Sequence, residues 1–218
     1  MGLDFSILPE YSDYFLTGTL WTLALTALSM FFSISGGILF AVLQLNRHAI
    51  IRWPTSFIAW LFMGTPLLLQ LFLVYFGLVQ IGIDLNAFVA GVIALSLHFA
   101  VYNSDIIRSA IVAVDSGQVE AARSLGLSNF QALRKIIVPQ AVANVTPALG
   151  NMMIALLKES ALVSVIGVME LTLSAQRAIS DSFRPFEFYI AAAAIYYIIN
   201  LGLEQAVHFA ERRTARYR

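Results

Sequence analysis

The sequence predicts an all-α membrane protein, a polytopic bundle of about five transmembrane helices. Of its 218 residues, 59% are hydrophobic and only 12% are charged, whereas a soluble domain is about 45–50% apolar and about 25% charged. That apolar surface is too large to bury in one core, and lipid is the solvent that tolerates it. The length suits one compact domain, residues 1–218, with no separate soluble domain.

Five apolar runs approach or exceed the roughly 20 residues that a helix needs to cross a bilayer. They are residues 15–43, 53–81, 87–114, 136–157 and 188–209. Gly64-Thr65-Pro66 interrupts the second run. This break is either a proline kink whose freed carbonyls bond to neighbours, which we favour, or a bend that lines a path. The fourth run contains two prolines and is the least regular. A shorter apolar run, 161–171, and a polar stretch, 172–187, separate the last two spans.

Basic residues in the loops predict the orientation, because cytoplasmic loops carry an excess of Lys and Arg. With the N-terminus outside, the outer segments hold only Arg177 and Arg184, and the inner ones hold nine basic residues: Arg47, Arg52, Arg123, Arg134, Lys135, Arg212, Arg213, Arg216 and Arg218. We therefore expect the N-terminus outside, the C-terminus inside and an odd number of spans. The basic tail, 212–218, is most simply part of this bias, with contact to anionic lipid as the alternative.

The cytoplasmic loop, about residues 115–135, has the pattern of two short helices joined at a glycine. Asp115 and Gln118 have capping-box spacing for a helix over 118–125, and Ser128 and Gln131 repeat that spacing for a second helix that runs toward a proline. Gly126 between them suits the left-handed position that ends a helix. The loop is therefore expected to be structured.

The first loop helix contains Glu120-Ala121-Ala122. Small side chains let a helix enter a groove on another protein closely, although a solvated loop that only caps the bundle is an equal interpretation of this pattern alone. Together with Gly126 and the later Ile137-Val138-Pro139-Gln140-Ala141, the segment resembles the EAA loop of binding-protein-dependent ABC importer permeases.

Three further segments extend this resemblance to the polar amino-acid (histidine/glutamine/arginine-type) branch of that family. Residues 64–70, GTPLLLQ, resemble its RGTPLLVQ segment, residues 102–108 resemble AYxSEIxR, and residues 158–167 resemble KDTSLVSVIG. Met63 stands where the family usually has Arg, and His98 where it often has Asn. These two departures leave the details of the second span and the specificity open.

The resemblance implies the fold of an ABC importer permease in the bacterial cytoplasmic (inner) membrane, with several passes through it. It implies as partners two ATPase subunits, a second identical or similar permease, an extracytoplasmic binding protein, a polar amino acid as substrate, and membrane lipid. It also implies that Glu120 and Gly126 couple transport to the ATPase, and that Ala121 and Ala122 pack in a groove on it.

This chain is not expected to hydrolyse ATP itself. A phosphate-binding loop needs Gly-Lys-Ser/Thr, and the only lysines, Lys135 and Lys158, do not follow a glycine. No cofactor is expected in this chain, since ATP and magnesium would belong to the partner ATPase. A metal site is not expected either, because cysteine is absent and His98 has no second histidine at ligand spacing. The zero net charge gives no reason to expect nucleic acid.

Ionisable residues at membrane depth are costly and often functional. Asp105 and Arg108 share one face of the third span, and Lys158 and Glu159 separate two apolar runs, as in the interrupted helices of transporter substrate sites. Their charges match the carboxylate and ammonium of a free amino acid. Alternatively, Asp105 and Arg108 neutralise each other, and Lys158 and Glu159 lie at the outer rim. The substrate-path candidates are Thr65, Tyr102, Asn103, Asp105, Arg108, Lys158, Glu159 and Ser160.

Two other functions fit parts of the sequence. A secondary amino-acid transporter driven by an ion gradient could use Asp105, Glu159 and the broken helix, but it has no use for an ordered Ala-Ala helix in the cytoplasm. A membrane scaffold without transport would tolerate apolar replacements of Asp105, Lys158 and Glu159.

Overall fold

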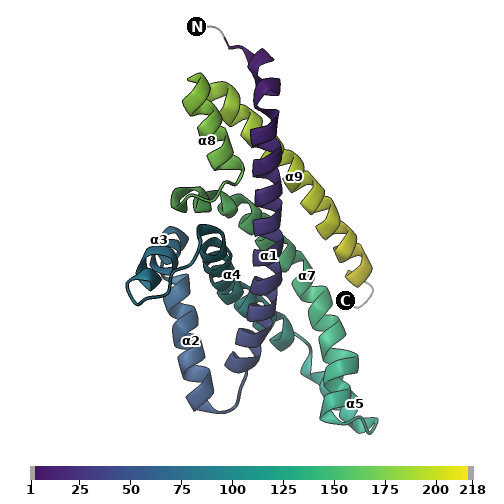
Figure 1. Ribbon diagram of the computed structural model, residues 1–218. Coiled ribbons are helices and arrows are strands. Elements are labelled where there is room, and N and C mark those ends of the chain that lie inside the picture. The colour runs from purple at the N-terminus through teal and green to yellow at the C-terminus, as the bar shows by residue number, and fades with distance from the viewer. Residues whose placement is uncertain (1–2, 216–218) are drawn as a thin grey trace.

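The computed structural model describes residues 3–215, and α-, 3₁₀- and π-helices account for most of that range (Figure 1). The α-helices are α1 Ser12–Gln44, α2 Ala49–Met63, α3 Leu67–Phe72, α4 Ala87–Val112, α5 Ser116–Ser124, α6 Asn129–Ala132, α7 Val138–Glu159, α8 Leu171–Ser182 and α9 Pro185–Thr214. The 3₁₀-helices are η1 Phe5–Tyr11 and η4 Ser160–Ile166, and the π-helical turns are η2 Leu73–Gly77 and η3 Leu133–Ile137.

Within the described residues, four continuous helical stretches are long and apolar enough to cross a membrane, and a bent pair supplies a fifth. The four are Phe5–Gln44, Ala87–Val112, Asn129–Ile166 and Pro185–Thr214, and the pair is Ala49–Met63 with Leu67–Gly77. This confirms the all-α bundle of about five spans. The N-terminal end and α8 lie at one end of the molecule, and the α1–α2 turn and α5 lie at the other (Figure 1). Arg216 and Arg218 of the basic tail lie outside the described residues.

The fourth span differs from its prediction, because the second loop helix and the span form one unbroken rod from Asn129 to Ile166. The second loop helix was expected only to run toward Pro139. Pro139 stands in the first turn of α7, directly after the π-helical turn η3. A π-helical turn inserts one extra residue into the helix, and proline is tolerated in a first helical turn, where its missing N–H is not needed. The rod therefore passes through the proline without a break.

The core of the bundle is the long interface between α1 and α4. Small side chains let the two helices approach closely, as is usual where both sides are otherwise apolar. A Cβ on Gly37 of α1 would lie 2.7 Å from the Cβ of Asn103 and 3.2 Å from the carbonyl oxygen of Ala100, both on α4. Asn103 donates a hydrogen bond to Ser33 on α1 (Nδ2–Oγ, 3.3 Å). Asn103 thus serves this interface.

The second span is broken sharply at Gly64-Thr65-Pro66, where α2 and the α3–η2 segment meet at 109°. The expectation of a proline kink is wrong, because the chain changes direction completely instead of bending one helix. Gln70, which is only 6% exposed, holds the break. Its Nε2 donates to the carbonyl oxygens of Phe62 (2.8 Å) and Thr65 (3.0 Å) and to the hydroxyl of Thr65 (2.8 Å). The backbone groups freed by the break are thereby satisfied inside the protein, as they must be in lipid.

The outer end is closed by α8, which the sequence suggested only as a polar stretch. Glu170, fully buried, caps α8 by accepting hydrogen bonds from the N–H groups of Thr172 and Leu173, both at 2.8 Å, and from the hydroxyl of Tyr196 on α9 at 2.6 Å. Thr22 of α1 accepts a further hydrogen bond from the N–H of Leu171 at 3.0 Å. These bonds tie α8 to α1 and α9.

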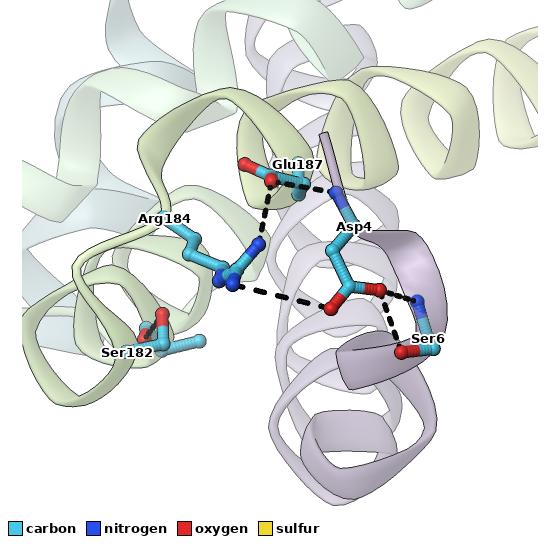
Figure 2. Close-up of polar contacts among 6 residues, drawn as sticks. Asp4, Ser6, Ser182, Arg184 and Glu187 are labelled. Carbon is cyan, nitrogen blue, oxygen red and sulfur yellow. Dashed lines mark hydrogen bonds and ion pairs between the residues drawn. The ribbon is translucent and has the colours of Figure 1, made fainter. Parts of the chain in front are cut away.

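A polar cluster at the same end joins the N-terminal segment to the start of α9 (Figure 2). Glu187 accepts hydrogen bonds at its Oε1 from the N–H of Asp4 (3.1 Å) and from Arg184 (3.3 Å), while Arg184 lies 3.9 Å from the Asp4 carboxylate. Hydrogen bonds from the hydroxyl and N–H of Ser6 hold the pKa of Asp4 below its ordinary value. This cluster fixes the beginning of the first span against the last.

We expect Gly37→Ala to destabilise the purified protein by about 1–3 kcal/mol, because the added methyl group overpacks the α1–α4 interface against backbone atoms. Gly202→Ala in α9 is the matched control, since a Cβ there meets no atom within 4 Å. It should be neutral or stabilise by about 0.5–1 kcal/mol through helix propensity. Thermal unfolding in detergent measures both. Equal melting temperatures for the two variants would contradict the close approach.

We expect Gln70→Leu to destabilise the protein by about 1–3 kcal/mol, because it leaves the carbonyls of Phe62 and Thr65 buried without a donor. Gln80→Leu, an exposed position after η2, is the control and should change stability little. Thermal unfolding gives the comparison, and limited proteolysis would show whether cleavage appears at residues 62–66. A Gln70 variant as stable and as resistant as the Gln80 variant would show that the clamp is unimportant.

Candidate functional site

The broken second span opens a cavity of about 680 Å³ between α2, α3, α4 and the α7–η4 junction. An interrupted helix at membrane depth is a common position for a transporter substrate site. Its polar and charged lining side chains are those of Thr65, His98, Tyr102, Lys158 and Glu159, and its apolar lining includes Met63, Pro66, Leu67, Leu68, Ala161 and Leu162. We call this the central cavity. The structure thus brings together four of the eight predicted path residues, from three separate parts of the chain.

Lys158 and Glu159 give the central cavity one positive and one negative group. They are the last two residues of α7, where the α-helix changes to the 3₁₀-helix η4. Neither side chain forms an ion pair with another residue in the range 3–215. An unpaired cation and an unpaired anion in one cavity are complementary to a zwitterion. Mutual neutralisation was the alternative for Asp105 and Arg108, and those two residues do form an ion pair.

His98 belongs to the central cavity and not only to the core. Its Nδ1 lies 3.0 Å from Oε1 of Gln70. The Gln70 amide nitrogen faces two carbonyl oxygens, which can only accept, so Oε1 must face the imidazole and accept from Nδ1–H. In the neutral ring, Nε2 is then an acceptor and is the nitrogen left for a ligand. Sequence reasoning missed this placement of His98. The four-residue spacing of His98 and Tyr102, whose rings lie 5.0 Å apart, is the signal that could have found it.

Asp105 and Arg108 lie outside the central cavity. They form an ion pair at 2.6 Å on α4 and line a second pocket of about 410 Å³ with Gln44, Arg52, Ser56, Ala59, Trp60 and Met63. The last two predicted path residues are in neither pocket. Asn103 packs against α1, and Ser160 is fully buried with its hydroxyl donating to the Leu157 carbonyl oxygen at 2.7 Å. A further hollow of about 490 Å³ between α1 and α4 is lined by no charged side chain and suits lipid or an apolar partner.

At the opposite end of the rod, the loop helix α5 is capped at both ends. Asp115 caps it by accepting a hydrogen bond from the N–H of Gly117 (2.6 Å), not through the box expected with Gln118. Gly126, at φ +81°, ends it with two hydrogen bonds, Gly126 N–H to the Arg123 carbonyl and Leu127 N–H to the Ala122 carbonyl. This is the Schellman arrangement, so the left-handed glycine is confirmed. Ser128 and Gln131 form both halves of the second predicted capping box.

The surface of this loop differs from the expectation in one residue. Glu120 and Ala121 are exposed, but Ala122 is 1% exposed and packs within the loop itself, so it is not free to enter a groove on a partner. Two large apolar side chains take its place on the surface, Leu125 at 82% and Phe130 at 69% exposed. These two exposed side chains are available for contact with another protein. Sequence reasoning missed them because their periodicity alone does not separate inner from outer faces in such short helices.

No group of three or more His, Asp or Glu side chains that could hold a metal ion occurs in the described part of the chain. Within residues 3–215, the groups that the central cavity offers to a ligand are charged and hydrogen-bonding side chains. Such an arrangement can bind and release a polar molecule.

Comparison with known proteins agrees with this geometry. Residues 33–216 match the family described as binding-protein-dependent transport system inner membrane component. The arginine transport system permease protein ArtQ of Bacillus subtilis (strain 168) is 38% identical over 214 residues, which is 98% of either chain. A crystal structure of an amino acid ABC transporter with histidines contains a chain that superposes with a TM-score of 0.92 at 43% identity, over 98% of this chain and 100% of that one.

A more distant solved structure shares the fold alone. A chain of the MetNI methionine ABC transporter in an inward-facing conformation superposes with a TM-score of 0.70 at 21% identity, over 91% of this chain. The family match covers most of the sequence, and the relatives match over their full lengths. This chain belongs to the family of inner membrane components of binding-protein-dependent transport systems.

Proposed function

We propose that this chain is the membrane-spanning subunit of an ATP-driven importer of polar amino acids. It forms the translocation path and couples that path to a cytoplasmic ATPase. The observation that carries the proposal is the central cavity, which places an unpaired lysine and an unpaired glutamate at a broken transmembrane helix. The names of the relatives, an arginine permease and an amino acid ABC transporter, support the substrate class.

The central cavity offers complementary groups to the invariant part of a free amino acid. Lys158 is the partner for the carboxylate, and Glu159 for the ammonium. The Nε2 lone pair of neutral His98 and the hydroxyl of Tyr102 remain for a polar side chain, while Leu67 and Leu162 provide apolar walls. Charge-assisted hydrogen bonds of this kind are stronger than neutral ones and exceed what water offers in a partly dehydrated cavity.

A single helical rod connects the cavity to the cytoplasmic loop. The α5 helix packs on α6 and η3, and the stretch from Asn129 to Ile166 continues from there to Lys158 and Glu159 without a break. A displacement of α5 is therefore transmitted directly to the two charged groups. In the proposed mechanism of alternating access, a loaded binding protein docks outside, ATP closes the ATPase subunits, and the motion of α5 opens the cavity to the other side.

The proposed assembly has two such permease chains, identical or similar, two ATPase subunits that carry ATP and magnesium, and an extracytoplasmic binding protein. Glu120, Ala121 and Gly126 form the contact with the ATPase, with Leu125 and Phe130 as its apolar part. The central cavity is open on one side, and lipid cannot cover charged groups at membrane depth. This is an argument for a second permease subunit that covers the open side. An ion-gradient transporter is the rival, and it requires neither ATP nor α5.

Lys158→Gln or Glu159→Gln should weaken amino-acid binding by the purified permease–ATPase complex roughly tenfold to a hundredfold, since each removes a charge-assisted contact worth about 1.5–3 kcal/mol. Equilibrium binding of radiolabelled L-arginine, L-glutamine and L-histidine measures this. Lys135→Gln, the other lysine of the chain, is the control and should leave binding intact, because Lys135 lies at the cytoplasmic end of the rod. Unchanged binding in both cavity variants would exclude this cavity as the substrate site.

Glu120→Ala and Gly126→Asp should reduce the amount of ATPase subunit that co-purifies from native membranes, or uncouple ATP hydrolysis from amino-acid uptake. Gly126→Asp also strains the left-handed position that ends α5. Gly82→Asp is the matched control, because Gly82 has φ +84° and open space around it but lies in the loop between η2 and α4. If wild type brings down no ATPase and the α5 variants still support uptake, the ion-coupled rival replaces the importer.

A further inference from the structure

The second pocket lies next to the central cavity, and the two share one lining residue, Met63. His98, Tyr102, Asp105 and Arg108 follow one another on α4 at intervals of four, three and three residues, so they share one face of that helix. The α2 helix packs beside α4 (Figure 1) and contributes its own side of the second pocket. Polar groups thus follow one face of α4 from the central cavity to the second pocket.

Charges in the second pocket are arranged for a zwitterion. Arg108 donates to Asp105 at 2.6 Å, and Arg52 on α2 has no ion-pair partner in the range 3–215. A simple anion would be attracted by Arg52 but repelled by the carboxylate of Asp105. A simple cation would meet two arginines. A molecule with one carboxylate and one ammonium can satisfy all three side chains, and it leaves the net charge of the pocket unchanged.

We propose that Arg52, Asp105 and Arg108 form a second, transient binding site for the zwitterionic backbone of the amino acid as it leaves the central cavity for the cytoplasm. The carboxylate replaces Asp105 on Arg108 and also contacts Arg52, while the ammonium binds Asp105. When the amino acid departs, the Asp105–Arg108 pair closes again, and Arg52 returns to its state without an ion-pair partner among the described residues. That replacement keeps the site weak, as an exit site must be. The inference rests on the proposed function of the central cavity.

The headgroup of phosphatidylethanolamine has the same chemistry, an anion and a primary ammonium. The position of the second pocket next to the central cavity, with Met63 in the lining of both, favours the amino acid. The lipid is therefore the alternative that the experiment must separate.

Because the chain has no cysteine, single cysteines can report on each pocket. Ser56→Cys reports on the second pocket, Ala161→Cys on the central cavity, and Ser109→Cys, exposed on α4 but in neither pocket, serves as the control. The permease–ATPase complex is placed in nanodiscs with and without phosphatidylethanolamine. The rate of modification by a methanethiosulfonate reagent is measured with L-arginine, L-glutamine or L-histidine. The amide of each amino acid, which lacks the carboxylate, is the ligand control.

We expect an amino acid, at about ten times the dissociation constant of the pocket being probed, to slow modification about tenfold at Ser56→Cys and at Ala161→Cys, and not at Ser109→Cys. The weaker second pocket requires the higher concentration. Its amide should protect neither pocket. Adding Asp105→Asn with Arg108→Gln should abolish protection at Ser56→Cys while protection at Ala161→Cys remains, which also shows that the variant is folded. Glu211→Gln, which breaks an exposed pair of the same spacing on α9, should change nothing.

Each other outcome has a distinct meaning. Protection at Ala161→Cys but never at Ser56→Cys overturns the exit site and leaves the central cavity standing. Protection at neither position contradicts the proposed function itself. A further outcome is that modification at Ser56→Cys is slowed by phosphatidylethanolamine in the nanodisc and is unaffected by the amino acid. That result assigns the second pocket to lipid and overturns the proposal.

Discussion

In a bilayer, an unpaired backbone carbonyl or N–H costs several kcal/mol, and this constraint decides how the second span can be built. The chain leaves its helix at Gly64-Thr65-Pro66, and one buried side chain makes that possible. The Gln70 amide nitrogen donates hydrogen bonds to the freed carbonyls, and its Oε1 accepts one from Nδ1–H of His98. The same bonds that stabilise the break orient the imidazole toward the central cavity. The break in the second span and the orientation of His98 therefore both depend on the side-chain amide of Gln70. The pocket can exist at membrane depth because the protein itself supplies hydrogen bonds to the backbone groups at the break.

The number and type of the spans could be predicted from the sequence because hydrophobic length and loop charge are local properties. Capping signals were equally local, and Ser128 with Gln131 formed the expected box. The continuity of the rod through Pro139 could not be predicted, since it depends on a π-helical turn that no residue type specifies. Glu170 and α8 were missed for a similar reason: the cap is completed by Tyr196 and Thr22, which come from other spans.

For the site, sequence reasoning found the charged residues but not their grouping. Lys158 and Glu159 face Thr65 and Tyr102 only because the 109° break turns α3 across α4 and the end of α7. Asn103 was a predicted path residue, but it serves helix packing at Gly37. Ala122 was selected by motif and is buried in its own loop. In each case the role of the residue depends on which other helix packs against it. That packing cannot be read from a single sequence.

Lys158 and Glu159 end α7 within the continuous helical stretch from Asn129 to Ile166, and this position has a mechanical consequence. The two charges are consecutive residues, so any stroke along the rod moves the cation and the anion by nearly the same distance. A zwitterion bound to both keeps both contacts or loses both. In the proposed function, a displacement that begins at the cytoplasmic loop would therefore form or break both contacts together.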